Sequence, residues 1–485
     1  MKPVIVWFRQ DLRLANQLAL SAAAATGQPV IPLYILDDTT PGEWKHGGAS
    51  RWWLDKSLAS LAASLEAIGS RLILRQGQSA AILTTLAEET GASVIYTQAA
   101  YEPWASALEH RIHTDMSVRG VDFKRMAGAV MKRPDSIRTQ SGHPFKVYTP
   151  FWRAFQAGPP VANPVPAPTQ LAKPTRWPKS DTLASWHLHP TKPDWSSGFS
   201  AEWVPGEAGA TARLETFLDD ALRDYSDDRN RPDRPGTSKL SPHLHFGEIS
   251  PATCWHAAIA TAHRISANGG TADRGLDTFQ RELVWREFST HLLVHWPTLP
   301  DEPFKPEYAA FPYIDDPKGL HAWQRGQTGY PIVDAGMREL WHTGWMHNRV
   351  RMITASFLIK DLLIPWQAGE AWFWNTLVDA DLASNAASWQ WVAGCGADAA
   401  PYFRIFNPSR QGATFDPGGA YVRRWVPELS KLPSEHIHEP WAAPPLVLAA
   451  SGVNLGQNYP HPIVDHAKAR DRALFALKEL KAATS

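Results

Sequence analysis

The stretch that decides the fold class of this chain is residues 334–412, which read DAGMRELWHTGWMHNRVRMITASFLIKDLLIPWQAGEAWFWNTLVDADLASNAASWQWVAGCGADAAPYFRIFNPSRQG. Indoles, guanidinium groups, carboxylates and amides recur here at helical spacing and fall on the same predicted helix faces. An ordinary helical core needs volume and apolarity, and it does not need so many polar groups. The stretch therefore predicts a helical domain that encloses a pocket for a flat ligand with polar edges.

Residues 347–360 are expected to form one helix of this domain. Asn348, Arg351, Met352 and Ala355 would then lie on one face, which carries an amide, a guanidinium and a thioether where a structural helix would carry leucines. A solvent-exposed face is the alternative interpretation. Because apolar residues occupy the other sides of the helix, we favour a buried face that lines the pocket.

The segment VDADLASNAASWQW places two carboxylates, Asp379 and Asp381, at the expected start of the next helix. Asn385 and Trp389 follow at successive steps of four residues. Carboxylates at a helix N-terminus are often only caps. A buried Arg351 would nevertheless need a carboxylate partner, so we predict an ion pair between Arg351 and Asp379 that lines the pocket.

A further helix is predicted over the segment LDTFQRELVWREFST. Glu282 and Trp285 share a face of it, and Arg286 lies one turn beyond Glu282. A carboxyl group beside an indole can bind the edge of a nucleic-acid base while the ring stacks on the base plane. A surface Glu–Arg pair next to a core tryptophan is an equally good interpretation, and the sequence leaves both open.

Residues 227–250, DDRNRPDRPGTSKLSPHLHFGEIS, follow soon after Tyr225 and have the composition of a phosphate-binding loop. Hydroxyl groups and backbone N–H groups after a Pro-Gly turn can bind a phosphate; the hydroxyl residues are Thr237, Ser238 and Ser241. Positive charge comes from Arg229, Arg231 and Arg234. His243 and His245 have no carboxylate at metal-ligand spacing, so we predict a structural role for both.

The N-terminal part has a different pattern. Short apolar runs at residues 4–8, 30–36, 71–75, 93–97 and 121–126 alternate with helical segments, which predicts a parallel, doubly wound sheet. The dinucleotide motif GxGxxG is absent after the first run, so a nicotinamide cofactor is not expected there. Ligands of such sheets bind at the carboxyl ends of the strands, which here are followed by loops around Asp11, Glu43 and Glu102.

A proline-rich segment, residues 158–205, separates this pattern from helical patterns that continue to the end of the sequence. The predicted division is an α/β domain, a long connector and an all-α domain. The three ranges are residues 1–130, 131–205 and 206–485.

The composition excludes several classes of protein. The two cysteines, Cys254 and Cys395, form no metal or iron–sulfur motif, and no signal peptide or long apolar run is present. Lys+Arg and Asp+Glu both number 48, so net charge gives no sign of a nucleic-acid partner. Most of the 23 tryptophans are expected in cores. We expect a soluble, cytoplasmic monomer that binds neither a metal nor a membrane.

Several long motifs make the chain similar to the DNA photolyase and cryptochrome family over nearly its full length. They are WFRQDLRLAN, GTSKLSPHLHFGEIS, ELVWREF, WQRGQTGYPIVDAGMREL, TGWMHNRVRMITASFLIKDLL and DADLASNAASWQWVAGCGADAAPYFRIFNP. The chain most resembles bacterial photolyases for cyclobutane pyrimidine dimers, of class I or a class III-like kind. The resemblance implies an α/β antenna-binding domain, a connector and a helical domain that holds FAD and binds DNA.

The resemblance also implies residue roles. The implied FAD contacts are Tyr225, Thr237, Ser238, Lys239, Leu240, Ser241, Arg286, Trp345, Asn348, Arg351, Asp379, Ala380, Asp381 and Asn385. Asn385 would face flavin N5 and tune the reduced, anionic state. The implied contacts of a flipped-out dimer are Arg229, Glu282, Trp285, Asn348, Arg349, Met352 and Trp391.

The function implied is light-driven repair of cyclobutane dimers by electron transfer from excited, reduced FAD, with Glu282 stabilising the charged dimer. Relatives that repair the (6-4) photoproduct carry histidines in place of Asn348 and Met352, which favours cyclobutane dimers here. The alternatives are a blue-light signalling flavoprotein without repair activity and a helical DNA-binding protein without a cofactor.

Two further features of the family are expected. Photoreduction would proceed through Trp389 and Trp366 to Tyr313, with Trp372 or Trp374 as substitutes for the last position. A second, antenna chromophore is expected to be 5,10-methenyltetrahydrofolate and not a deazaflavin. Glu43 is an expected contact of this chromophore, while the usual Asn-Glu pair is replaced by Trp104 and Ala105, so we expect stacking on an aromatic ring.

Overall fold

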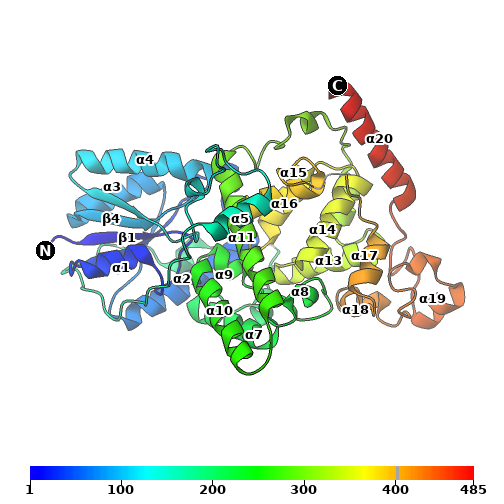
Figure 1. The fold of residues 1–485 in the computed structure, drawn as a ribbon, viewed down its shortest axis with the longest axis horizontal. Helices are drawn as coiled ribbons and strands as arrows, with labels where there is room; N and C mark the ends of the chain where they lie inside the picture. The colour runs from blue at the N-terminus through cyan, green and yellow to red at the C-terminus, as the bar shows by residue number, and fades with distance from the viewer. Residues whose placement is uncertain (192, 400–402, 485) are drawn as a thin grey trace.

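The computed structural model describes residues 1–191, 193–399 and 403–484 and has an α/β part and a helical part (Figure 1). All strands of the described chain lie in one parallel sheet with the order β3-β2-β1-β4-β5. The strands are β1 (Val4–Phe8), β2 (Val30–Leu36), β3 (Ile73–Gln76), β4 (Val94–Gln98) and β5 (Asp122–Met126). The chain winds outward from β1 in both directions, which confirms the doubly wound topology.

Helices cover both faces of this sheet. They are α1 (Leu18–Ala25), α2 (Gly48–Ala67), α3 (Ser79–Thr90) and α4 (Pro103–Val118). Alternate residues of β1 enter two separate cores: Val4 and Val6 pack with α1 and α2, whereas Ile5 and Trp7 pack with α3 and α4. Burial on both faces explains why β1, β2 and β4 read as continuous apolar runs in the sequence, whereas the edge strand β5 is largely exposed.

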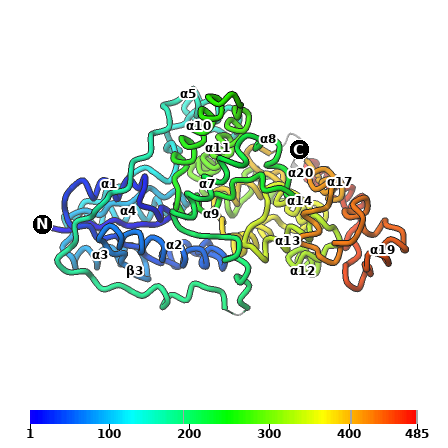
Figure 2. Tube along the Cα trace, turned by 90° about the horizontal axis from the view of Figure 1, so that it is seen from below, coloured from blue at the N-terminus to red at the C-terminus, as the bar shows by residue number. Residues whose placement is uncertain are grey.

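The connector crosses the surface of the α/β part (Figure 2). It begins after α5 (Tyr148–Ala157), and its regular structure among the described residues is limited to two short helical turns, η3 (Leu183–Trp186) and α6 (Phe199–Glu202). The backbone N–H of Val30 donates to the carbonyl of Ala172 at 2.9 Å, and His189 lies 2.8 Å from Asp55. These contacts hold the connector along the domain, as expected for a loop of this length. The exact domain boundaries stay a prediction.

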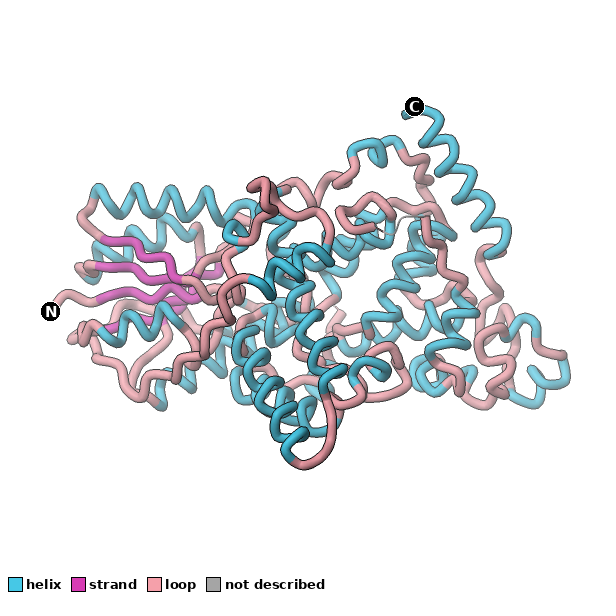
Figure 3. The backbone as a smooth tube through the Cα atoms, viewed as in Figure 1, coloured by secondary structure: helices cyan, strands magenta, loops and turns pink. Residues whose placement is uncertain are grey.

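The rest of the described chain contains helices and loops (Figure 3). The helices are α7 (Glu207–Asp220), α8 (Tyr225–Asp228), α9 (Ser241–His245), α10 (Pro251–Ala267), α11 (Asp273–His295), α12 (Pro317–Gln324), α13 (Pro331–Thr343), α14 (Asn348–Ser356), α15 (Trp366–Thr376), α16 (Leu382–Ala393), α17 (Pro408–Phe415), α18 (Ala420–Trp425), α19 (Pro445–Ser451) and α20 (His466–Thr484). Shorter turns in this part are η4 (Pro306–Ala310), η6 (Pro427–Leu429) and η7 (Pro440–Ala442), and two more, η1 (Gly42–Trp44) and η2 (Pro134–Ser136), precede it in the chain. The all-α prediction for this part is confirmed.

The helix predicted at residues 347–360 is shorter than expected. His347 is its N-cap, because its Nδ1 accepts a hydrogen bond from the N–H of Arg349 at 3.2 Å. Burial lowers the pKa of His347 to about 3, which keeps the ring neutral and able to accept this bond. After α14 the chain continues as a π-helical turn, η5 (Phe357–Asp361). There Lys360 donates to the carbonyl of Arg404, and Asp361 pairs with His466 of α20. The two neighbouring buried side chains therefore attach this turn to two different segments of the chain.

The described residues contain no helix that is both long and apolar enough to cross a bilayer. Within the same residues, no cluster of three or more His, Cys, Asp or Glu side chains is arranged to hold a metal ion.

Candidate functional site

The ion pair predicted between Arg351 and Asp379 is present. Arg351 Nη2 lies 2.8 Å from Asp379 Oδ2, and its Nε donates to the carbonyl of Met346 at 2.7 Å. The Asp379 side chain is only 3% exposed, so the carboxylate is removed from water and depends on this guanidinium for its charge balance. The pair joins α14 to the loop before α16, and Ala380 of that loop is buried.

A second polar cluster forms where α9, α11 and α16 meet. Arg286 Nη2 donates to the carbonyl of Leu244 at 3.1 Å, whereas its Nη1 is buried and has no acceptor among the described residues. Asp381 caps α16 by accepting from Ser384 N, and it lies 3.9 Å from His245. Burial alone would raise the pKa of Asp381, but His245 and Arg286 hold it below its usual range.

Both ring nitrogens of His245 are buried, and neither has a hydrogen-bond partner in the part of the chain described. Buried polar groups without a hydrogen-bond partner are rare in folded proteins. Next to the charged side chains of Arg286 and Asp381, they mark a position that a polar ligand can fill. The neighbouring His243 differs, because its Nδ1 lies 2.5 Å from Glu248. Both histidines therefore lie near carboxylates, which the sequence spacing had not indicated.

Trp345 and the loop at residues 237–241 lie beside the Arg351–Asp379 pair. Trp345 Nε1 donates to Ser241 Oγ at 3.3 Å, and the Lys239 ammonium lies 5.2 Å from the centre of the Trp345 ring. Arg351 lies 5.8 Å from the same ring centre. The loop backbone is in the left-handed region at Lys239, with φ of 50°, and Leu240 is buried. These contacts bring the predicted phosphate-binding loop next to α14.

Glu282 pairs with Arg229 and not with Arg286, which corrects the helical Glu–Arg pair considered from the sequence. Arg229 Nη2 lies 2.8 Å from Glu282 Oε2, and the guanidinium lies 5.8 Å from the centre of the Tyr225 ring. Burial raises the pKa of Glu282, and the charge of Arg229 offsets part of that effect. Glu282 is therefore inclined to hold its proton more strongly than an exposed glutamate.

Arg349 links the Arg229–Glu282 pair to α14. Its Nη2 donates to Asn230 Oδ1 at 2.6 Å, next to Arg229 in the chain, and its Nη1 lies 3.8 Å from Met352 Sδ. Asn348 is exposed at the start of α14, and Trp391 is half-buried on α16. The grouping of these residues into one substrate cavity stays a prediction.

The aromatic and amide residues predicted for electron transfer lie on α15 and α16 and in one loop. Trp389 and Trp366 are both buried in the large core of the helical part, and Trp389 packs against Gly369, where a Cβ would come within 2.1 Å of its ring. Asn385 donates to the carbonyl of Glu370 at 3.2 Å. Tyr313 is half-buried, with its ring centre 4.7 Å from that of Phe311.

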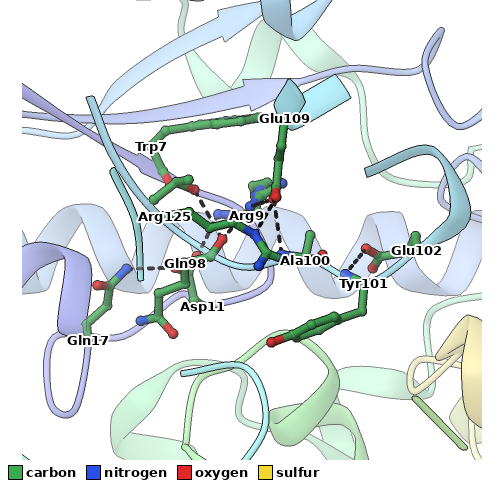
Figure 4. Close-up of polar contacts among 11 residues, drawn as sticks. Trp7, Arg9, Asp11, Gln17, Gln98, Ala100, Tyr101, Glu102, Glu109 and Arg125 are labelled. Carbon is green, nitrogen blue, oxygen red and sulfur yellow. Dashed lines mark hydrogen bonds and ion pairs between the residues drawn. The ribbon is translucent and has the colours of Figure 1, made fainter. Parts of the chain in front are cut away.

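A cavity lies at the carboxyl ends of β1, β2 and β4 and extends to the helical part, where Arg286 and Asp381 line it. Figure 4 shows the polar side chains around its α/β end. Sequence reasoning missed most of this lining, including Trp7, Arg9, Gln98 and Tyr101. The position after parallel strands was the available signal, and it had indicated only Asp11, Glu43 and Glu102.

Several polar atoms of this lining are buried and lack a hydrogen-bond partner within the described residues. They are Trp7 Nε1, Gln98 Nε2 and Oε1, and Tyr101 Oη. Arg9 is fixed by an ion pair with Glu109 at 2.6 Å, and burial raises the pKa of Glu102. Trp104 also lines the cavity, whereas Glu43 is exposed and lies outside the lining, so the expected Glu43 contact is not supported. The donors and acceptors fit a planar ligand with a polar edge.

The fold combines an α/β part with a helical part, with buried polar clusters among the helices and a cavity at the carboxyl ends of the strands. Residues 279–479 match the FAD binding domain of DNA photolyase, and residues 4–169 match the DNA photolyase domain. The chain belongs to the DNA photolyase and cryptochrome family, and it is a photolyase-type enzyme with an FAD-binding domain.

Individual relatives agree with this membership. The chain is 51% identical over 482 residues to the deoxyribodipyrimidine photo-lyase of Agrobacterium fabrum, with 99% of each chain covered. It is 38% identical to cryptochrome-1 of Arabidopsis thaliana, covering 99% of this chain and 71% of the relative. The crystal structure of a bacterial class III photolyase from Agrobacterium tumefaciens superposes with a TM-score of 0.95 and 50% identity, covering 99% of this chain and 98% of that chain.

Proposed function

We propose that the protein repairs cyclobutane pyrimidine dimers in DNA by light-driven electron transfer from reduced FAD. The observation that carries the proposal is the Arg229–Glu282 pair, which joins the end of α8 to α11, with Glu282 one turn before Trp285 and Arg286. A carboxyl group, an indole and a guanidinium on one helix can bind a base edge, stack on a base and contact a cofactor. The name of the Agrobacterium fabrum relative points to the same substrate.

FAD is assigned to the helical site between α9, α11, α14 and α16. The unsatisfied Arg286 Nη1 and His245 nitrogens are the groups that a polar cofactor would satisfy there. Arg351–Asp379, Asp381 and Asn385 would surround the ring system, while Tyr225 and residues 237–241 would hold the phosphate and ribityl part. When bound in its reduced form and excited by light, FAD supplies the electron that opens the cyclobutane ring.

The residues of the chain bind and position the dimer. A lesion inside the stack is out of reach of a buried cofactor, so the dimer has to be flipped out, and Trp285 offers a ring on which it can stack. Glu282, whose pKa is raised by burial, would donate a hydrogen bond to a dimer carbonyl and stabilise its negative charge. Asn348 and Met352 carry no imidazolium, in keeping with a reaction that needs no strong acid.

The decisive experiment is illumination of the reduced protein with an oligonucleotide that contains one thymine dimer, scored by the thymine absorbance that returns. We expect absorbance to return only in the light and only with reduced flavin. Intact flavin with no recovery of absorbance would refute repair. That result would favour the second candidate, a blue-light signalling flavoprotein, which the similarity to cryptochrome-1 keeps under consideration.

We further propose that the crevice cavity binds 5,10-methenyltetrahydrofolate as an antenna. Its unsatisfied groups at Trp7, Gln98 and Tyr101 suit the polar edge of a pterin, and Trp104 offers a ring for stacking. Replacing Trp104 by alanine should remove the near-ultraviolet folate band from the purified protein and leave its FAD content unchanged. A blue deazaflavin band in the wild-type spectrum, or an intact folate band in the variant, would contradict this proposal.

Photoreduction of the flavin is proposed to run through Trp389 and Trp366 to Tyr313. Replacing Tyr313 by phenylalanine removes the phenol that would be oxidised last and keeps the packing against Phe311. We expect slower photoreduction in transient absorption with an unchanged flavin content, whereas Tyr308→Phe, in the same region, should behave as wild type. Unchanged kinetics in Tyr313→Phe would eliminate Tyr313 and favour Trp372 or Trp374.

A further inference from the structure

Trp285 has an unusually close aromatic neighbour. The ring of Tyr148, the first residue of α5, lies 3.7 Å from the Trp285 ring, centre to centre, with an angle of 6° between the planes. The next nearest ring, that of Phe288, contacts both from the side, at 5.8 Å and 72–74°. Tyr148 is buried and Trp285 is half-buried. Because Tyr148 covers one face of the indole, only the other face of Trp285 is left for a base to stack on.

Hydrogen bonds hold Tyr148 in this position. Its hydroxyl donates to the carbonyl of Arg281 at 2.7 Å, and its backbone N–H donates to Asp398 Oδ2 at 3.3 Å. Arg281 is four residues before Trp285 on α11, so its carbonyl belongs to the helical turn that carries the indole. Burial, with a smaller contribution from Glu282, raises the pKa of Tyr148, which keeps the phenol available as a donor.

We propose that Tyr148 is a positioning residue for dimer binding, which fixes the plane of Trp285 so that its free face meets the flipped-out lesion. The inference rests on the proposed repair function, because it assigns the free face of Trp285 to the dimer. A lone half-buried indole on a helix surface can rotate about its two side-chain torsions. The parallel ring of Tyr148, anchored to the same helical turn, restricts that rotation and lowers the entropy cost of stacking a base.

The first test is a double-mutant cycle with Tyr148→Leu and Trp285→Ala, read as binding of an oligonucleotide with one thymine dimer against the undamaged oligonucleotide. Tyr148→Leu should weaken dimer binding by about 2- to 12-fold, the range of one aromatic pair, and leave binding of undamaged DNA and FAD content unchanged. Tyr148→Phe keeps the ring and should restore most of the affinity. In the Trp285→Ala background, Tyr148→Leu should have no further effect. Equal losses in both backgrounds would overturn the proposal.

A second readout does not depend on DNA. In protein labelled with fluorotryptophan, the ¹⁹F resonance of Trp285 is the one lost in Trp285→Phe. It should move or broaden in Tyr148→Leu, stay nearly in place in Tyr148→Phe, and stay in place in the control variant Phe145→Leu, which alters a half-buried ring packed against the same core. An unmoved resonance in Tyr148→Leu would overturn the positioning role. Wild-type protein with no preference for dimer DNA, but with the expected resonance shift, would refute the repair function alone.

Discussion

The Arg351→Leu variant is expected to fold and to lose FAD. Asp379 is 3% exposed and lies 2.8 Å from Arg351, so removal of the guanidinium leaves a buried carboxylate without charge balance in the wall of the proposed flavin site. Breaking a buried pair costs about 3–5 kcal/mol, which corresponds to a loss of about 100-fold or more in affinity if the cost falls on the FAD complex. The measurement is the flavin-to-protein ratio after purification, together with FAD titration of the apoprotein.

A double variant separates a cofactor role from a structural one. Arg351→Met/Asp379→Leu replaces the pair by apolar side chains, which often restores stability. We expect its melting temperature to return toward the wild-type value while FAD binding stays lost. Arg264→Leu is the matched control, since the Arg264–Asp219 pair has side chains 62% and 64% exposed and such pairs contribute about 0–1 kcal/mol. Wild-type flavin content in Arg351→Leu would contradict the assignment of the site.

Local patterns in the sequence were sufficient for much of this architecture. Buried parallel strands read as apolar runs, and α13 has clear signals at both ends, because Pro331 begins it and Gly344 ends it with φ of 69°. The Arg351–Asp379 pair could be predicted because a guanidinium on a helix with apolar neighbours needs a carboxylate, and Asp379 starts the next polar segment. The need of a buried guanidinium for a carboxylate was therefore enough to identify Asp379 as the partner of Arg351.

Other contacts depend on how distant segments meet, which local spacing does not encode. Glu282 has Arg286 one turn away on α11, yet it pairs with Arg229 after α8, because the fold brings that residue closer in the right direction. The crevice lining was missed for the same reason. Trp7 and Gln98 lie near the carboxyl ends of β1 and β4, which are far apart in the chain, and only the sheet order makes them neighbours.

The Glu282→Ala variant is expected to keep its FAD and to repair dimers with a yield per absorbed photon that is lower by about tenfold. The carboxyl group is the proposed donor to a dimer carbonyl, and a hydrogen bond to a charged group contributes about 1.5–3 kcal/mol. Without this hydrogen bond, the negative charge on the dimer is less stable. A larger fraction of the electrons then returns before the ring opens, and fewer dimers are repaired. The measurement is thymine absorbance recovered per photon, with flavin absorbance recorded on the same sample.

Glu282→Gln is the matched control for this prediction. Its amide keeps the size of the side chain and can still donate a hydrogen bond, so most of the yield should remain. Arg229 loses its partner in the alanine variant, but its side chain is 23% exposed and water can partly solvate it, so a large loss of fold stability is not expected. If Glu282→Ala repairs as well as wild type, or if it loses flavin in proportion to repair, the carboxyl group has no direct role at the dimer, and Glu282 serves only to hold Arg229 beside Tyr225.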